Sequence, residues 1–539
     1  MLAPTNRDRV HERRWAILAV LALAVFVTVL DGTIVNVALP TLAGSLGAST
    51  SQLQWIVDAY LLVFTGLLLA AGGLGDRYGR KRALMTGLVV FGATSAFAGL
   101  AGGADVLILG RALMGIGAAL IFPATLAILT NTFTDPGERA KAIGVWSAVS
   151  GVAVAAGPII GGWLLEHFWW GSVFFVNVPI VIVVLVAVLV LVPESRESDA
   201  PALDWRGLIL SIAAIGTLVF TIIEAPKWGW LTPETFLGFA ASAALLTGFI
   251  AWELRVEHPM LPVRIFRNLR FTAASASITS AFFALFGFIF LITQYFQLIR
   301  GYSPLEAGVR TLPVAFSIAI ASVVAPRVVA RVGTTRVVAT GLVLMAAGFL
   351  WVSTASASTS YLEIVGQMIL LGVGLGSTTA PATESIMGSV SLDKAGVGSA
   401  VNDTTRELGG TLGVAIVGSV FSSVYVNALG SGRVFSALPP QAQRATEDSV
   451  SAAGQVATRL GAAAPGFMTE VSNAFLSGLS VACLVVAGVA LAGAFVAWRF
   501  LPARAEVDAR EPGTDPAPDP RPAALGVDAL QPEVVAPGA

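Results

Sequence analysis

The chain has 539 residues, of which 55% are apolar and only 12% are charged, and its mean hydropathy is +0.80. Soluble globular proteins carry about 25% charged residues, so the composition excludes an ordinary soluble domain and indicates a chain that crosses a membrane many times. The formal net charge of −1 gives no indication of a nucleic-acid partner.

Long apolar runs alternate with short polar breaks along the chain. A helix needs about 20 apolar residues to cross roughly 30 Å of hydrocarbon, and in lipid the backbone must satisfy its own hydrogen bonds, which favours helices. The runs predict an all-α polytopic membrane protein with fourteen spans, at residues 15–38, 53–73, 83–103, 105–130, 140–164, 172–193, 207–225, 234–254, 272–297, 306–329, 336–355, 361–388, 398–426 and 475–501. The first run is too long for the apolar region of a signal peptide.

Basic residues gather at alternate ends of these spans. With the N-terminus placed in the cytoplasm, the cytoplasmic segments and tail hold most of the 32 lysine and arginine residues, as the positive-inside rule requires. An even number of spans then puts both termini in the cytoplasm. A composition rich in Ala, Val, Gly and Arg hints at a GC-rich bacterial genome, so the expected location is the bacterial inner (plasma) membrane.

Two short basic segments indicate an internal repeat. Residues 72–82 link the second and third spans, and a weaker copy at residues 326–336 links the tenth and eleventh. Gly79 of the first segment matches Gly333 of the second, whereas Asp76 has no acidic counterpart. The eight intervening spans fit two related six-span halves with two spans inserted between them, and related halves are a known plan of secondary transporters.

The predicted organisation has five parts. They are a cytoplasmic N-terminus (1–14), an N-terminal six-helix bundle (15–193), a linker with two extra transmembrane helices (194–271), a C-terminal six-helix bundle (272–501) that includes an external loop (427–474), and a disordered, Pro-rich and acidic cytoplasmic tail (502–539). In the external loop, Pro439 and Pro440 followed by residues 441–460 predict a short helix with proline in its first turn.

The chain offers little for enzyme chemistry. Its 3 histidines are scattered, no metal-ligand cluster or nucleophile motif is evident, and the single cysteine, Cys483, is expected to pack in the core. No lysine lies in a G-x-x-x-x-G-K-[ST] motif. We therefore expect no enzyme activity and no cofactor, and energy from an ion gradient rather than from ATP.

Several motifs occur in an order typical of one family. Residues 72–82 match the pattern G-x-L-x-D-R-x-G-R-[RK], residues 30–40 form a first-span motif, residues 111–119 form a fourth-span motif, and residues 157–162 form a fifth-span motif. Further matches are Trp169, Trp170 and residues 177–179, 294–297, 301–304 and 402–410. Over roughly residues 15–500 the chain thus resembles the major facilitator superfamily (MFS), specifically its fourteen-span drug:proton antiporter family.

The resemblance implies the MFS fold, with two six-helix bundles plus two inserted transmembrane helices. It also implies a proton-coupled antiporter that exports hydrophobic or cationic drugs or antibiotics by alternating access. The implied partners are a small-molecule substrate, protons as the coupling ion and membrane lipids, with the protein acting as a monomer. An alternative stays open, which is export or flipping of a lipid or an endogenous secondary metabolite by the same fold.

The candidate proton-coupling residues are Asp31 and Arg111. An ionised carboxylate inside a span is costly unless it faces water or a partner; burial disfavours its charged form, whereas a nearby cation favours that form. A carboxylate balanced between these effects can take up a proton from one side and release it to the other. Arginine stays charged in proteins, so Arg111 is the natural partner. The alternatives are a structural hydrogen bond for Asp31 and a static helix clamp for the pair.

Four further side chains are candidates for substrate binding: Asp58, Glu384, Phe286 and Phe290. A carboxylate would attract a cationic drug, and phenylalanine rings would line an apolar pocket. For Asp58 the alternatives are a second proton site or a solvated position near the outer mouth. For the phenylalanines the alternative is packing or lipid contact.

The basic loop is the candidate conformational lock, with residues Gly72, Asp76, Arg77, Gly79, Arg80 and Lys81. A carboxylate is favourable at a helix N-terminus, so Asp76 is expected to cap a helix of the opposite half while Arg77 and Arg80 meet its acids. This contact would hold the outward-open state and break when the cytoplasmic side opens. The alternative is a simple positive-inside anchor.

Two more groups complete the candidates. Small residues allow close helix approach and a bend in the fifth span, and the resemblance implies that this helix seals against proton leak; these residues are Gly144, Gly157, Pro158, Gly161 and Gly162. Near the inner end of the thirteenth span, an ion network at the cytoplasmic end is expected among Asp403, Arg406 and Glu407.

Overall fold

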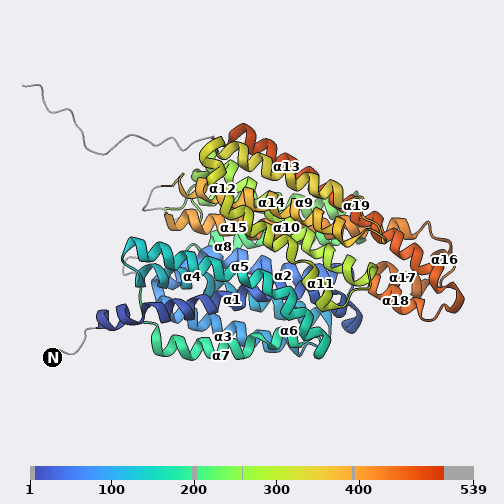
Figure 1. Cartoon of the computed structure of the whole chain (residues 1–539), viewed down its shortest axis with the longest axis horizontal. Helices are drawn as coiled ribbons and strands as arrows, with labels where there is room; N and C mark the ends of the chain where they lie inside the picture. Colours follow the sequence, from blue (N-terminus) through green and yellow to red (C-terminus); the bar gives the residue numbers. More distant parts are fainter. Residues whose placement is uncertain (1–5, 197–202, 258, 391–394, 503–539) are drawn as a thin grey trace, which may run out of the picture. The chain divides into compact units, whose positions relative to one another are not determined.

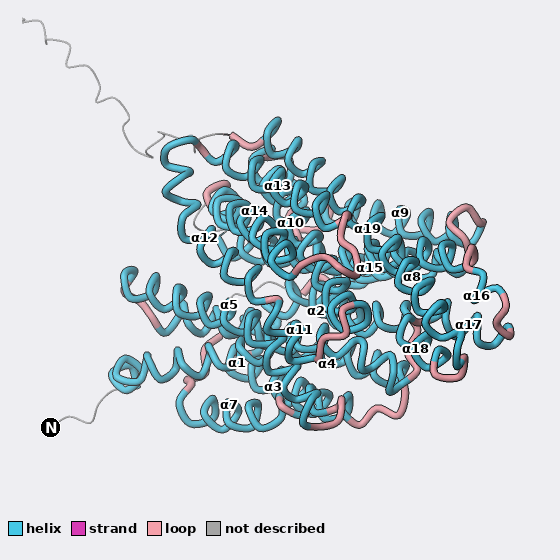
Figure 2. The backbone as a smooth tube through the Cα atoms, turned by 45° about the vertical axis from the view of Figure 1, so that its right-hand side comes forward, coloured by secondary structure: helices cyan, strands magenta, loops and turns pink. Residues whose placement is uncertain are grey.

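The computed structural model describes residues 6–196, 203–257, 259–390 and 395–502. Within these ranges the regular secondary structure is entirely helical (Figure 2). Fourteen helical segments are long and apolar enough to cross a membrane. The predicted all-α fold with fourteen spans is therefore confirmed, whereas the predicted tail lies, apart from Pro502, outside the described residues.

The first seven helices, here called the N-terminal group, pack mainly against one another. They are α1 (Asn6–Leu46), α2 (Thr50–Tyr78), α3 (Arg80–Gly99), α4 (Ala104–Thr132), α5 (Pro136–His167), α6 (Ser172–Phe175) and α7 (Asn177–Leu191). Helix α1 packs against α4, α5 and α7, while α4 also contacts α2 and α3. The sixth predicted span is split at Val176 into α6 and α7. Helix α7 therefore begins at Asn177, which is buried among the helices of the group.

A second set of helices, here called the C-terminal group, follows the same pattern. They are α10 (Leu269–Gln294) with the π-helical turn η2 (Tyr295–Ile299), α11 (Pro304–Arg310), α12 (Leu312–Val332), α13 (Thr334–Val352), α14 (Tyr361–Met387), α15 (Ala395–Leu429) and α19 (Ala464–Phe500). Helix α10 packs on α14, α15 and α19, and α13 on α14 and α19. The tenth predicted span consists of α11 and α12, separated at Thr311.

Two helices lie between these groups in the sequence. Helix α8 (Trp205–Trp228) and helix α9 (Pro233–Glu253) pack on each other, and the 3-10 turn η1 (Val263–Arg267) leads on to α10. Helix α8 also contacts α2 and α15. The inserted pair therefore lies beside the place where the two groups meet. The residue boundaries predicted for the bundles and the linker stay predictions.

The two basic loops share one backbone device. Gly79 ends α2 with φ +114°, and Gly333 ends α12 with φ +89°. The amide of Gly79 donates to the Gly75 carbonyl at 3.0 Å, and that of Gly333 to the Val329 carbonyl at 2.8 Å. Glycine adopts positive φ without steric cost, so the sequence match between these loops reflects the same turn between two helices.

The segment between α15 and α19 differs from its prediction. It contains α16 (Arg433–Ser436), α17 (Pro440–Asp448), α18 (Val450–Ala457) and the short turn η4 (Gly461–Ala463). Figure 1 shows α16, α17 and α18 together at the end opposite the N-terminus. The predicted single helix is two helices, because Ser449 is extended (φ −157°, ψ 127°). The helix of the last span begins at Ala464 rather than at residue 475, since buried Phe467 and Val471 continue the apolar face of α19.

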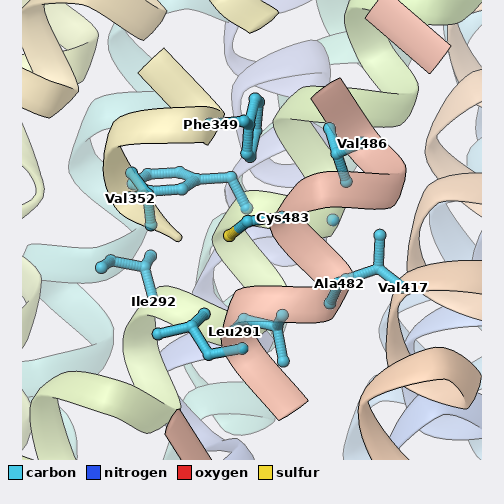
Figure 3. Close-up of a pocket in the computed structure, with 11 residues that line it drawn as sticks. Leu291, Ile292, Phe349, Val352, Val417, Ala482, Cys483 and Val486 are labelled. Atoms are coloured by element: carbon cyan, nitrogen blue, oxygen red, sulfur yellow. The ribbon is translucent and has the colours of Figure 1, made fainter. Parts of the chain in front are cut away.

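A small apolar cavity inside the C-terminal group contains the only cysteine. Figure 3 shows Cys483 of α19 facing Phe349, Val352 and Ile292 from neighbouring helices. Its walls carry no charged side chain. The thiol is buried and unpaired, which agrees with the packing role expected for it.

Candidate functional site

A buried ion pair lies within the N-terminal group. Arg111 of α4 contacts the Oδ2 of Asp31 on α1, and both side chains are buried. The Arg111 Nε donates to the Ile56 carbonyl at 2.9 Å, and its guanidinium lies 4.2 Å from the centre of the Tyr60 ring. The structure thus brings together the two residues that were predicted as partners. Removing one member of such a pair leaves an uncompensated buried charge, which costs about 3–5 kcal/mol.

The second oxygen of Asp31 has a partner that the sequence did not reveal. The amide nitrogen of Asn177 donates to Asp31 Oδ1 at 2.9 Å and to the Ser95 hydroxyl at 3.1 Å. The Ser95 hydroxyl donates in turn to the Phe174 carbonyl at 2.8 Å. Asn177 had been noted only as part of a motif. Its signal in the sequence is a polar amide at the start of an otherwise apolar helix.

Asp58 is also completely buried, on α2. Neither of its carboxylate oxygens has a hydrogen-bond partner among the described residues. One turn earlier, the Gln54 amide donates to the Ala415 carbonyl of α15 at 2.9 Å. The alternative of a solvated residue at the outer mouth is therefore wrong for this conformation, and the carboxyl lies in the packed region where α2 meets α15.

The other substrate-binding candidates have different environments. Glu384 is exposed near the end of α14. The Phe286 ring is partly exposed and lies 6.4 Å from the Phe282 ring. Phe290 is fully buried in the core, so a wall position in an open pocket is wrong for this ring in this conformation. These candidates do not converge on one pocket here.

The predicted ion network near the start of α15 is only partly assembled. Among the described residues, no ion pair joins Arg406 to Asp403 or Glu407. Arg406 donates instead to the Thr383 hydroxyl at 3.1 Å and lies 5.4 Å from the Phe282 ring centre. Its Nε is buried without a hydrogen-bond partner. The three charges still lie close enough to interact electrostatically, so the ion network stays a prediction.

Among the described residues, side-chain contacts of the basic loop join it to itself, to α7 and to Glu194 just after α7. Asp76 pairs with Arg80 at 2.7 Å, and the Lys81 ammonium donates to the Leu189 carbonyl at 3.0 Å. The Lys81 amide donates to a Glu194 carboxylate oxygen at 3.1 Å. Arg77 lies 5.7 Å from the adjacent Tyr78 ring. The described residues thus show Asp76 paired within its own loop rather than at a helix of the opposite group, and the lock in the outward-open state stays a prediction.

The fifth-span glycines lie where helices approach most closely. A Cβ added at Gly157 would lie 2.0 Å from the Thr33 hydroxyl oxygen, and one at Gly161 would lie 2.7 Å from Ile34, both on α1. A Cβ at Gly162 would lie 2.5 Å from the Leu305 Cα of α11. Close approach is therefore confirmed at these three positions.

The other two members of that motif differ. Gly144 has no atom within 4 Å of an added Cβ, so the prediction of a close approach there is wrong. Its part of α5 faces open space in this conformation. Pro158 lies inside α5, and its carbonyl would be 2.2 Å from a Cβ added at Gly308 of α11. The α5–α11 contact is thus tight from both sides.

Hydrogen bonds between the two groups lie at the end that carries α17 and α18. We call this contact region the outer seam. Besides Gln54, it includes the side-chain amide of Gln297, which donates to the Val37 carbonyl at 2.9 Å, and the backbone amide of Leu305, which donates to the Glu166 carboxylate at 3.3 Å. Two more hydrogen bonds join the α17–α18 segment to α1 and α2. The Thr50 hydroxyl donates to the Asp448 carbonyl, and the Gln455 side-chain amide donates to the Gly44 carbonyl. At the opposite end, the described residues show no hydrogen bond between the groups.

Twelve membrane-length helices in two groups and an inserted pair, with a buried acid–base pair inside one group and the hydrogen bonds between the described parts of the groups at one end, are the features of a membrane transporter. The family follows from direct comparison. Residues 21–414 match the model of the Major Facilitator Superfamily. The chain belongs to this superfamily.

Several known proteins are similar in sequence to most or nearly all of this chain. The tetracenomycin C resistance and export protein of Streptomyces glaucescens is 35% identical over 96% of this chain and 97% of its own length. The multidrug efflux pump LfrA of Mycolicibacterium smegmatis is 36% identical, covering 91% and 97%. The methyl viologen resistance protein SmvA of Salmonella typhimurium is 37% identical, covering 83% and 90%.

A solved structure shares the fold. A bacterial homologue of the human lysosomal transporter Spinster, in an inward-facing and unoccupied conformation, matches with a TM-score of 0.66 at 17% identity, over 91% of this chain and 98% of that one. This match supports the helix arrangement and carries no information about substrate.

Proposed function

We propose that this chain is a proton-coupled antiporter that exports hydrophobic or cationic drugs or antibiotics from the cytoplasm across the inner membrane by alternating access. The observation that carries the proposal is the buried pair of Asp31 and Arg111 within a membrane-spanning group. Intramembrane charges are expensive and mark ion pathways. The export of antibiotics and organic cations by the relatives supports the choice of cargo.

The position of the seam supports alternating access. With the basic loops in the cytoplasm, as the positive-inside rule requires, the outer seam faces outward and the conformation is inward-facing. Release of the Asp31 proton to the cytoplasm strengthens its attraction to Arg111. Because a ligand shifts a conformational equilibrium only through different affinity for the two states, protonation and drug binding must favour different states of the cycle. Both termini then lie in the cytoplasm, and one monomer suffices.

The test uses purified full-length protein in liposomes with an imposed pH gradient. The probes are ethidium and methyl viologen, and the variants are Asp31→Asn and the control Asp105→Asn. Asp105 is an aspartate at the start of α4 that accepts a hydrogen bond from Gln52 at 2.8 Å. We expect uphill transport by the wild type and Asp105→Asn, and none by Asp31→Asn. Equal transport by the wild type after an ionophore collapses the gradient would overturn proton coupling.

A second cargo class stays in view because one relative is named for resistance to and export of tetracenomycin C. The chain would then export an endogenous secondary metabolite or a lipid by the same mechanism. Liposomes that move neither probe, but in which the protein moves a fluorescent phospholipid between leaflets, would favour this alternative.

A further inference from the structure

The hydrogen bonds around Asn177 have one direction. The Ser95 hydroxyl donates its hydrogen to the Phe174 carbonyl at 2.8 Å. Its oxygen can therefore only accept from the Asn177 side-chain amide, at 3.1 Å. The remaining amide hydrogen of Asn177 points to Asp31 at 2.9 Å. Four helices, α1, α3, α6 and α7, thus contribute to a chain of hydrogen bonds between the Phe174 carbonyl and the Asp31 carboxylate.

This orientation leaves the other end of the amide without a partner. The Asn177 Oδ1 is buried and accepts no hydrogen bond from the described residues. An unsatisfied buried acceptor is unfavourable, so the orientation persists because both amide hydrogens have acceptors. An amide offers donors on one side and an acceptor on the other, and the two ends are similar in size, so a half turn fits the same space.

Protonation of Asp31 changes what it needs from its neighbours. A neutral carboxyl has an O–H donor that requires an acceptor. Arg111, the other partner of Asp31, has donors only. Of the two described side chains that hydrogen-bond to Asp31, Asn177 can therefore serve both forms, by donating to the carboxylate or, after a half turn, by accepting from the acid.

We propose that Asn177 is a positioning residue for proton exchange, which holds the ionised Asp31 carboxylate with its amide nitrogen and receives the protonated form with its amide oxygen. This inference rests on the proposed function. The charged and titratable groups near Asp31 are Arg111 of α4 and Tyr60 of α2, and Glu407 of α15 acts on Tyr60. Asn177 and Ser95 are uncharged, so replacing Asn177 changes hydrogen bonding without removing a charge.

Two substitutions test this role. Asn177→Leu keeps a similar size and removes both donor and acceptor. Asn177→Asp keeps the shape but places a second carboxyl against Asp31. A second carboxyl disfavours the ionised form of Asp31 by like charge whichever role Asn177 has. Asn177→Asp therefore measures how strongly position 177 is coupled to Asp31, and Asn177→Leu decides between positioning and packing.

The measurement is the pH profile of ethidium efflux by full-length protein in liposomes. The control is Thr28→Val, which removes a buried hydroxyl that donates only to its own helix, at 2.9 Å to the Val25 carbonyl. The hydrogen bond to the ionised carboxylate is stronger than the one to the neutral acid, so losing both disfavours the ionised form. We therefore expect the half-maximal pH to rise by about one unit in Asn177→Leu, a tenfold change in proton affinity, and by more in Asn177→Asp. Thr28→Val keeps the wild-type profile.

The outcomes are distinct. An unchanged profile in Asn177→Leu, with a wild-type thermal unfolding midpoint, would show that Asn177 only packs and would overturn the inference while leaving the antiporter intact. A wild-type protein that moves ethidium without any dependence on the pH gradient would instead remove the proposed proton coupling, and the inference would fall with it.

Discussion

Gly162 offers the sharpest test of the outer seam. It lies on α5 opposite α11, where an added Cβ would be 2.5 Å from the Leu305 Cα and 2.6 Å from the Pro304 carbonyl oxygen. Both neighbours are backbone atoms, so they cannot move aside as the end of a flexible side chain can. In Gly162→Ala, α5 and α11 must therefore separate for the methyl group to fit.

The cost falls on one conformation. Overpacking of this kind costs about 1–3 kcal/mol, and the clash exists only while α11 contacts α5. The sealed state should therefore lose about 5–150-fold in population relative to the state open at this end. Drug efflux should slow, because a transporter that rarely seals this end completes its cycle rarely.

A cysteine reporter reads this shift directly. In a Cys483→Ala background, Val37→Cys places a thiol at a fully buried seam position whose carbonyl accepts from Gln297 at 2.9 Å. A membrane-impermeant maleimide added from outside should label it slowly in the parent protein and faster by at least fivefold after Gly162→Ala.

Gly144→Ala is the matched control. It changes a glycine to alanine in the same helix, but no atom lies within 4 Å of the added Cβ. Labelling and efflux should match the parent, and the helix gains up to about 1 kcal/mol from the better helix former. Equal labelling rates in Gly162→Ala and Gly144→Ala would refute the claim that the α5–α11 contact seals this end.

Three further changes test other parts of the structure. Gly79→Ala forces an L-residue to φ +114° and a Cβ to 2.7 Å from the Glu194 carboxylate; at about 1–3 kcal/mol, the thermal unfolding midpoint should fall, and an unchanged midpoint would contradict the assigned turn. Gln54→Leu removes the 2.9 Å hydrogen bond to the Ala415 carbonyl, worth about 1 kcal/mol, so reporter labelling from outside should rise roughly fivefold; no rise would mean that this bond does not hold the seam. Cys483→Ala, in an apolar cavity, should cost about 1 kcal/mol of stability and leave dye efflux unchanged; lost efflux would assign the thiol a role beyond packing.

The spans were predictable because hydrocarbon imposes one requirement on every segment. A run of about 20 apolar residues with few charges is typical of a membrane-spanning helix. All fourteen predicted runs are helical in the structure. Breaks inside spans were harder to predict. Val176 splits α6 from α7 three residues before Pro179. Proline has no amide hydrogen, and its ring clashes with the carbonyl four residues earlier, here that of Phe175. The sequence therefore held a signal for this break, but a count of apolar residues does not record it.

Hydropathy also failed to predict the start of α19, because the residues there are mixed polar and apolar. Residues 464–474 mix Thr, Glu and Asn with apolar residues, which looks like a loop in a hydropathy plot. In the structure Phe467 and Val471 point into the core from one face of α19. A polar face that lies outside the hydrocarbon is compatible with a helix that extends beyond the membrane.

The site was predictable where charge was involved. Asp31 and Arg111 stood out because charged residues are rare within spans, and their contact followed from their similar depth. Neutral partners carried no such signal. Asn177 is one amide in a chain with many polar side chains, and the Tyr60 ring resembles any other aromatic residue. Their places beside Asp31 and Arg111 emerge only from the way that α2 and α7 pack around the pair.

The proton site and the outer seam lie on the same helix, and this makes coupling between them direct. Asp31 is six residues before Val37 on α1, which is about 9 Å along the helix axis at 1.5 Å per residue. Between them, Thr33 packs against Gly157 of α5 within the N-terminal group, and at Val37 itself the carbonyl accepts from Gln297 of η2 across the seam. Coupling needs an element whose equilibrium both sites bias. A rotation or shift of α1 that accompanies a change of charge at Asp31 would act on the α1–α5 packing and on this seam contact at once. In the proposed antiporter, α1 is therefore the element through which the proton changes the state of the outer seam.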